Sequence, residues 1–241
     1  FFSEESSLLA AGLAKHGVGK GDRVVLMLYR RMEFWTFLLA VHKLGAVAVP
    51  LPAKVSVKDI EYRLQFGQIK AAVIDESMSE KVEEARAGCP LLQVAIQVGD
   101  SRPPKGWIDF TTLRADGKAG AAKIQKTAGG TDPMFVYFSS GTSGSPKMVR
   151  HDHNYALGHT ITAMYWHDLR PDDIHLTIAD SGWAKAAWGK IYGQWMAGAT
   201  VFVYDFRGKF DAHKILELMA KHRVTTFCAP PTVYRMMIHQ H

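Results

Sequence analysis

Short apolar runs alternate with amphipathic segments along much of this 241-residue sequence, and this alternation is the strongest constraint on its fold. Apolar runs at residues 22–28, 70–76 and 91–99 have the length and composition of buried strands. The segments between them, such as residues 33–46 and 79–88, carry apolar side chains at helical spacing. Strands that alternate with helices form largely parallel sheets covered by helices. We therefore predict an α/β fold.

The alternation is interrupted once, and the interruption divides the chain into two portions, residues 1–130 and 131–241. Residues 100–131 are rich in glycine, proline and lysine, which indicates a loop or connector. A strand-like run resumes the pattern at residues 133–138. In the first portion, Ser56 precedes a helical segment. We expect Ser56 to cap that helix, because a serine hydroxyl accepts hydrogen bonds from the free N–H groups of a first turn.

Composition and charge exclude several classes of protein. Hydrophobic residues make up 47% and charged residues 22% of the sequence, as in soluble globular proteins. No apolar run reaches the roughly 18 residues that a membrane span needs. The formal net charge of +6 is typical of a solvated basic surface, or of attraction for an anionic ligand such as a nucleotide. The basic residues are scattered, so we do not expect a nucleic-acid groove.

The cysteines and the N-terminal residues bear on the compartment. Cys89 and Cys228 lie far apart without the spacing of metal ligands, and no basic region precedes the first apolar residues as it would in a signal peptide. We therefore expect no disulfide framework and a cytoplasmic location. The sequence does not indicate the oligomeric state.

A ribbon of small polar residues follows the strand-like run at residues 133–138 and ends on a proline and a lysine. Its hydroxyls can donate hydrogen bonds, its glycines let successive N–H groups face one anion, and its lysine adds a positive charge. The residue order excludes a Walker loop, whose lysine directly follows the second glycine, and a hydrolase nucleophile elbow, whose last glycine is here a serine. A generic anion-binding loop and a plain solvent loop remain as alternatives on composition alone. The ribbon comprises Ser139, Ser140, Gly141, Thr142, Ser143, Gly144, Ser145, Pro146 and Lys147.

The full stretch YFSSGTSGSPK at residues 137–147 resembles the phosphate-binding signature of the adenylate-forming superfamily. That superfamily includes acyl-CoA synthetases, luciferases and the adenylation domains of peptide synthetases. Residues 18–51 resemble its first conserved region, and residues 180–204 and 227–237 resemble the acyl-CoA synthetase versions of later regions. Residues 106–113 (GWIDFTTL) also resemble the medium-chain branch. The resemblance covers essentially the whole chain.

The resemblance implies a two-step reaction of a small carboxylic acid with ATP and coenzyme A. The carboxylate attacks the α-phosphorus of ATP and gives an acyl-adenylate and pyrophosphate. The thiol of coenzyme A then attacks the acyl carbon and releases AMP. The resemblance also implies that residues 139–147 bind the ATP phosphates, where fixed donors and the charge of Lys147 stabilise the departing pyrophosphate. A medium-chain acid is the favoured substrate, and acetate or propionate is the alternative.

Trp183, in the stretch DSGWAKAAW, has two interpretations. A tryptophan beside a strand end is commonly part of the core. The resemblance instead places an aromatic residue here beside the acyl group, where its bulk would shape the acyl pocket and Gly182 would leave room for the thiol. Asp180 follows the preceding strand-like run, and we expect it to orient its neighbours without a catalytic role.

The pair His151 and His153 has an H-x-H spacing that also occurs in metal sites. No third ligand cluster accompanies the pair, so structural or surface histidines are favoured and no metal site is assigned to this chain.

The later motifs of the superfamily are absent from this sequence: the segment that holds adenine and Mg²⁺, the acidic residue on the ribose, and the C-terminal domain with its catalytic lysine. Residues 1–241 therefore resemble an incomplete AMP-binding domain, with the catalytic residues and the Mg²⁺ ligands expected beyond residue 241. We expect these residues alone to be inactive. Two other hypotheses remain: an adenylating enzyme that loads a carrier protein, and a non-catalytic nucleotide-binding or interaction module.

Overall fold

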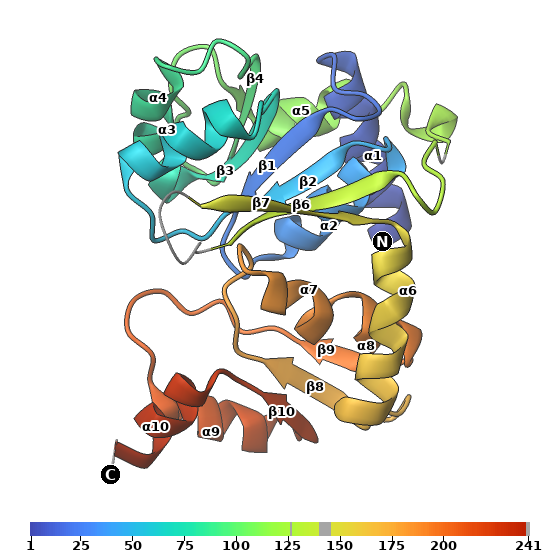
Figure 1. Cartoon of the computed structure of the whole chain (residues 1–241), viewed down its shortest axis with the longest axis vertical. Coiled ribbons are helices and arrows are strands. Elements are labelled where there is room, and N and C mark those ends of the chain that lie inside the picture. The colour runs from blue at the N-terminus through green and yellow to red at the C-terminus, as the bar shows by residue number, and fades with distance from the viewer. Residues whose placement is uncertain (126, 140–145, 240–241) are drawn as a thin grey trace. The chain divides into compact units, whose positions relative to one another are not determined.

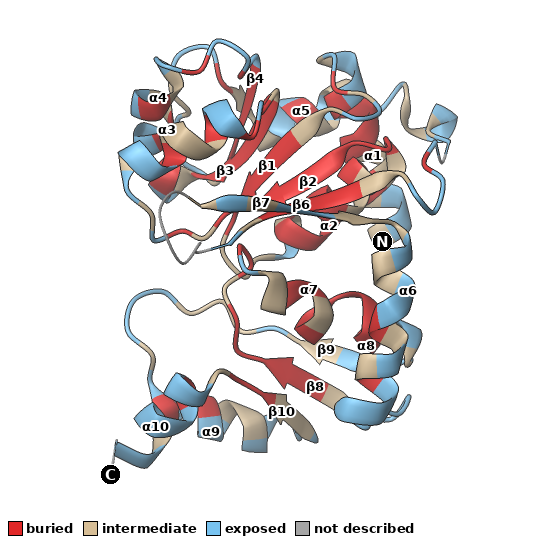
Figure 2. Cartoon of the chain, in the orientation of Figure 1, coloured by how far each residue is buried: buried red, intermediate tan, exposed pale blue. Residues whose placement is uncertain are grey.

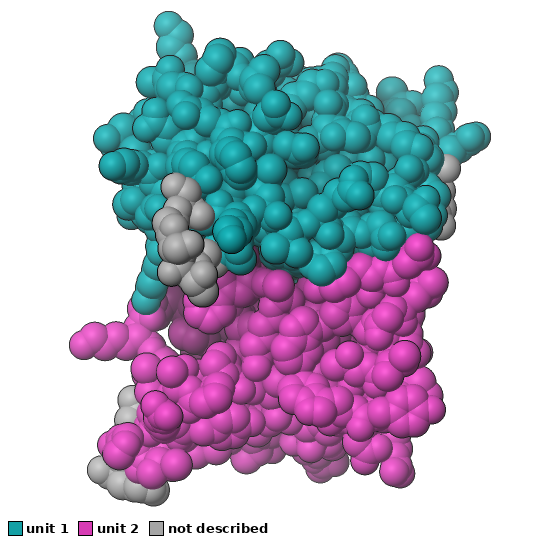
Figure 3. All heavy atoms as spheres, viewed as in Figure 1, with its two compact units in different colours: residues 1–153 teal, residues 154–241 magenta. Residues whose placement is uncertain are grey.

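The computed structural model describes residues 1–125, 127–139 and 146–239, which form two compact units, Phe1–His153 and Asn154–His241 (Figure 3). Each unit has its own sheet and its own helices. The units divide later in the chain than residue 130, where composition suggested a division. The reason is that the strand beginning at Pro133 pairs with the sheet of the first unit.

The described residues of the first unit form a seven-stranded sheet in the order β5-β4-β3-β1-β2-β6-β7 (Figure 1). Every neighbouring pair is parallel except β6 and β7, which form an antiparallel hairpin. The α/β fold with a largely parallel sheet is therefore confirmed. The strands are β1 Arg23–Met27, β2 Val47–Pro50, β3 Ala71–Asp75, β4 Val94–Val98, β5 Ile108–Asp109, β6 Pro133–Ser139 and β7 Lys147–Asp152.

Helices cover both faces of this sheet, with α3 and α4 on one face and α1, α2 and α5 on the other (Figure 1). This covering explains why β1 to β4 are almost continuously apolar rather than alternating (Figure 2). The helices are α1 Phe2–Lys15, α2 Met32–Lys43, α3 Val57–Phe66, α4 Ser79–Arg86 and α5 Phe110–Gly117, with short 3-10 turns at Glu76–Met78 and Ala121–Lys123.

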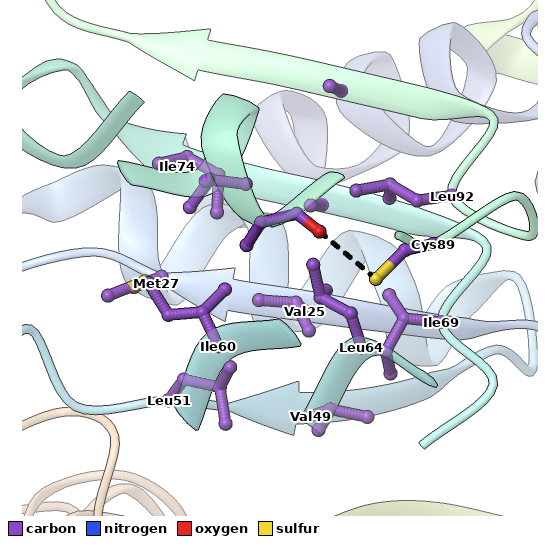
Figure 4. Packing of buried hydrophobic residues seen from close by; sticks show 14 of the residues in the cluster. Val25, Met27, Val49, Leu51, Ile60, Leu64, Ile69, Ile74, Cys89 and Leu92 are labelled. Atoms are coloured by element: carbon purple, nitrogen blue, oxygen red, sulfur yellow. Dashed lines mark hydrogen bonds between the residues drawn. The ribbon is translucent and has the colours of Figure 1, made fainter. Parts of the chain in front are cut away.

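A large buried cluster lies between the sheet and helices α3 and α4 (Figure 4). Alternate residues of β1, Val25 and Met27, point to this face, as expected for a pleated strand. Ile60 and Leu64 of α3 are each 1% exposed and pack against them. Burying two such side chains is worth about 2–3 kcal/mol each, so α3 is held firmly on the sheet.

Two local signals in the sequence produce the expected geometry. The Ser56 hydroxyl accepts a hydrogen bond from the Asp59 N–H at 3.1 Å and caps α3, as predicted. Helix α2 stops just before Gly45, whose φ of +65° is readily adopted by glycine.

The expectation of a loop or connector at residues 100–131 is wrong in part, because helix α5 and strand β5 lie within it. Asp109 caps α5 by accepting from the Thr112 N–H at 2.9 Å. Leu113 is fully buried, and Gly117 lies against the backbone of α1 at Leu8. The cap, the buried Leu113 and packing against α1 stabilise this short helix, whose polar composition concealed it in the sequence.

The described residues of the second unit form a three-stranded parallel sheet in the order β10-β8-β9. Its core contains Leu176, Ile178 and Ile215, with several aromatic side chains packed against them. Within the described part of the chain, no helix has the length and apolar character needed to cross a bilayer. The elements are α6 Asn154–Ile161, a π-helical turn Thr162–Trp166, β8 Ile174–Thr177, α7 Ala184–Lys190, α8 Tyr192–Met196, β9 Thr200–Phe202, α9 Ala212–Lys221, β10 Thr226–Cys228 and α10 Pro231–His239.

Candidate functional site

The ribbon of small polar residues is carried by the hairpin of β6 and β7. Ser139 ends β6 and Lys147 begins β7, and the two residues are partners in the antiparallel register. The Ser139 hydroxyl donates to the Lys147 carbonyl at 3.4 Å, and both side chains are exposed. The strand at Lys147 was not predicted, because glycine, serine and proline before it resemble an extended loop.

Six of the nine residues expected to bind phosphate lie outside the described residues: Ser140, Gly141, Thr142, Ser143, Gly144 and Ser145. The other three, Ser139, Pro146 and Lys147, are the last residue before this segment and the first two after it. The structure therefore defines the two strands that carry the segment, and the phosphate-binding role of all nine residues stays a prediction.

Two neighbouring residues of α3 contact the first strand of the hairpin and the residue that leads into its second strand. The Tyr62 hydroxyl donates to the Pro146 carbonyl at 3.1 Å, across 84 positions of sequence. The Arg63 guanidinium lies over the Phe138 ring, 5.6 Å from its centroid. No local pattern in the sequence could have revealed these contacts, because they depend on how the sheet brings α3 beside the hairpin.

In the second unit, Gly182 and Trp183 lie in the connection from β8 to α7. The Asp180 carboxylate accepts from the Gly182 N–H at 2.9 Å, and the Trp183 N–H donates to the Asp180 carbonyl at 3.1 Å. Asp180 thus orients its neighbours as expected. Gly182 is buried, whereas the Trp183 side chain is 52% exposed at the start of α7, so it does not fill the core of this unit.

A buried polar network fixes α7 on strand β8. His175 is fully buried, with one ring nitrogen 2.8 Å from the Thr226 hydroxyl and the other 2.9 Å from the Gly189 carbonyl. Burial lowers the pKa of His175, which favours the neutral ring. Lys190, at the end of α7, donates from Nζ to the Ala179 carbonyl at 2.7 Å and is 2% exposed. Nothing in the sequence distinguishes this lysine from a surface lysine.

Residues 184–196 form two helices, α7 and α8, that are separated by Ile191. Ile191 has φ of −131° and ψ of −86°, which is outside the helical region. The buried side chain of Gln194 accepts from the Ile191 N–H at 3.1 Å and donates to the Trp188 carbonyl at 3.0 Å. An internal glutamine thereby replaces the backbone hydrogen bonds of a continuous helix.

The described residues contain no group of three or more His, Cys, Asp or Glu side chains placed to hold a metal ion. His151 lies in β7, and burial lowers the pKa of its ring. His153 follows β7 and lies against His42 of α2, with ring centroids 5.6 Å apart. No metal-holding cluster is therefore assigned to the described residues, and the Mg²⁺ ligands of the sequence-based expectation lie beyond residue 241.

The comparison with protein families decides the identity of the fold, since residues 2–241 match the family model described as AMP-binding enzyme. The chain belongs to the AMP-binding enzyme family. The match includes both units and both candidate segments, the hairpin at residues 133–152 and the connection at residues 178–183.

Curated relatives include acyl-coenzyme A synthetase ACSM4 of Rattus norvegicus, which is 36% identical over 225 residues, and acyl-coenzyme A synthetase ACSM5 of Homo sapiens, which is 34% identical over 225 residues. Each alignment covers 93% of this chain and 38% of the relative. The chain thus spans well under half the length of these relatives.

Solved structures give the same fold. A Brucella canis acyl-CoA synthetase superposes on the whole chain with a TM-score of 0.88 and 27% identity, using 43% of that structure. The anthranilate CoA ligase AuaEII, in complex with anthranoyl-AMP, covers 94% of this chain with a TM-score of 0.82. Its identity of 22% supports the fold alone, and the chain corresponds to 43% of its length.

The expected cytoplasmic location is wrong by this comparison, because both named relatives are mitochondrial enzymes. Two widely separated cysteines exclude a disulfide framework and so favour a reducing compartment. Unpaired cysteines do not distinguish the cytosol from other reducing compartments.

Proposed function

We propose that this chain forms part of an ATP-dependent carboxylic acid–CoA ligase, with residues 139–147 as its ATP phosphate-binding segment. The observation that carries the proposal is the β6–β7 hairpin, which pairs Ser139 with Lys147 at the two ends of a serine-, threonine- and glycine-rich segment. The proposal is also supported by membership of the AMP-binding enzyme family and by relatives named as acyl-coenzyme A synthetases.

The first step forms a bond between a carboxylate oxygen and the α-phosphorus of ATP and breaks the bond from that phosphorus to the β-phosphate oxygen. The difficulty is electrostatic, since an anion must approach a polyanion while pyrophosphate leaves with added negative charge. The exposed ammonium of Lys147 and the hydroxyl and N–H donors of the segment would stabilise that charge. Ser139 and Lys147 lie on paired strands, so their backbones need little reorganisation during the reaction.

The second step forms the carbon–sulfur bond of the thioester and breaks the bond between the acyl carbon and the AMP oxygen. AMP leaves with that oxygen, and the thiol proton passes to the solvent. Gly182 and Trp183 are proposed as part of the acyl pocket, supported by the resemblance at residues 180–204 and by the exposure of Trp183. The favoured substrate is a medium-chain acid, because residues 106–113 resemble that branch. ATP and coenzyme A are co-substrates in this scheme.

The test of the function is acid-dependent exchange of radiolabelled pyrophosphate into ATP by the complete native protein that contains this chain. We expect exchange with medium-chain acids to exceed exchange with acetate or propionate, and a thioester to form when free coenzyme A is added. A carrier-loading enzyme would show pyrophosphate exchange but form no thioester with free coenzyme A. It would form a thioester when a carrier protein is added. If no acid on a broad panel supports exchange, the ligase proposal is wrong.

Replacing Trp183 with glycine should shift the preferred acid toward longer or bulkier chains, because the half-exposed indole ring would no longer limit the space beside Gly182. We expect the ratio of kcat/KM values for a long and a short acid to change by about tenfold or more, since each methylene in an apolar pocket is worth about 1 kcal/mol or more. Trp195→Leu, in α8 of the same unit, is the control and should leave that ratio unchanged. An unaltered ratio in Trp183→Gly would remove Trp183 from the acyl pocket.

A further inference from the structure

Two consecutive residues of α3, Tyr62 and Arg63, contact the hairpin that carries the proposed phosphate-binding segment. One contact lies before the segment and the other lies at its end. Tyr62 binds the residue that leads into the second strand, through the hydrogen bond from its hydroxyl to the Pro146 carbonyl. Arg63 binds the first strand, through its guanidinium over the Phe138 ring. Phe138 lies one residue inside the terminal Ser139–Lys147 pair of the hairpin and Pro146 one residue beyond it, so the two contacts flank that pair.

Helix α3 is a firm support for these contacts. Its start is capped by Ser56, and its inner face buries Ile60 and Leu64 in the core cluster (Figure 4). Phe138 and Met148, which face each other across the hairpin, pack against the same cluster. The helix and the two strands therefore share one buried cluster, and a shift of the helix would be transmitted through it to the hairpin.

The two side chains are also fixed individually. The Tyr62 ring stacks on Phe66 one turn later, with centroids 5.4 Å apart and an interplanar angle of 12°. Arg63 donates to the Asp59 carbonyl at 3.1 Å, one turn earlier on the same helix. Because both side chains are anchored to α3 itself, they lose little conformational entropy in holding the hairpin.

Pro146 makes the Tyr62 hydrogen bond more consequential. A proline has no N–H group, so its carbonyl is the only backbone group through which this residue can be held by hydrogen bonding. That carbonyl belongs to the peptide unit that leads into Lys147. The bond from Tyr62 therefore fixes the orientation of the backbone at the start of β7.

We infer that Tyr62 and Arg63 are positioning residues for adenylation, which fix the ends of the phosphate-binding segment so that the Lys147 ammonium meets the departing pyrophosphate. The inference rests on the proposed function of that segment. Neither side chain needs to touch the nucleotide. Their effect is to keep the hairpin ends in one arrangement, so that a larger fraction of the ATP complexes has Lys147 aligned with the pyrophosphate.

The test uses Tyr62→Phe in the complete native protein, because phenylalanine keeps the stack on Phe66 and removes only the hydroxyl. We expect kcat for pyrophosphate exchange to fall about threefold to tenfold, the size of one neutral hydrogen bond. The KM for the acid should not change. Conversion of a synthetic acyl-adenylate and coenzyme A to thioester should also be unchanged, because no pyrophosphate takes part in that step. Arg63→Met should act in the same direction.

Gln65→Met is the matched control. Gln65 also lies on α3 and also donates from its side chain to a backbone carbonyl, that of Gly88 at 2.8 Å, but Gly88 lies between α4 and β4. A purely structural role for Tyr62 predicts that Tyr62→Phe and Gln65→Met lower Tm alike and affect both half-reactions equally. That result, or exchange in Tyr62→Phe equal to that in Gln65→Met, would overturn the inference. Absence of acid-dependent exchange in the unsubstituted protein would instead overturn the proposed function.

Discussion

Substituting Lys147 with alanine is expected to reduce acid-dependent pyrophosphate exchange by about 100-fold to 1,000-fold in the complete native protein. A preorganised donor aimed at charge that develops in a transition state has an effect of about this size. Lys147 is exposed at the first position of β7, directly after the segment and paired with Ser139. Its removal would leave the departing pyrophosphate without its fixed cation.

The same substitution should leave the thioester-forming half-reaction within about twofold when a synthetic acyl-adenylate is supplied, since one transition-state interaction is removed and the acyl pocket is untouched. Arg150→Ala is the control, because Arg150 is another exposed cation on the same strand, paired with Val136 inside the hairpin. Unchanged exchange in Lys147→Ala, or an equal loss in Arg150→Ala, would contradict the assignment of Lys147.

Much of the fold could be predicted because its signals are local. The apolar runs that became β1, β3 and β4 are buried on both faces, which removes the alternation that a half-exposed strand would show. The cap at Ser56 is likewise a matter of one hydroxyl and the first turn that follows it. Such features need no knowledge of residues far away in the sequence.

The features that sequence reasoning missed depend on distant partners. Strand β7 is exposed for much of its length and is stabilised by antiparallel pairing with β6, so its polar residues gave no strand signal. The Tyr62 contact with Pro146 spans 84 positions. The break at Ile191 depends on a buried glutamine that was indistinguishable in the sequence from a surface residue.

The candidate site likewise has one part that the sequence suggests and one part that depends on distant contacts. The order of residues 139–147 suggested a phosphate-binding role through a resemblance, and the hairpin shows how the two ends of that segment are carried. What supports the ends, Tyr62 and Arg63 on one side of the sheet, follows only from packing. The motif thus names candidate binding residues, whereas the residues that hold the ends of the segment become visible only in the packed fold.

Lys190→Ala is expected to lower the free energy of unfolding of the second unit by about 2–4 kcal/mol. The substitution removes a buried side-chain stem, which costs about 2–5 kcal/mol in comparable positions, and leaves the Ala179 carbonyl without this donor at a further cost of about 1–3 kcal/mol. Relief from burying an ammonium group offsets part of the sum. Ala179 directly precedes Asp180, so the loss should loosen the connection that carries Gly182 and Trp183.

Lys190→Met separates these contributions, because methionine keeps most of the buried stem and removes only the charge and the hydrogen bond. Its destabilisation should be at most about 1 kcal/mol, because loss of the hydrogen bond and relief from burying the charge act in opposite directions. Native-state hydrogen exchange of the Ile178 amide, which donates to the Cys228 carbonyl at 2.8 Å, reports on this part of the unit. A loss of protection in Lys190→Ala no greater than in Lys190→Met would show that the stem contributes nothing, and that the lysine is retained for its charge alone.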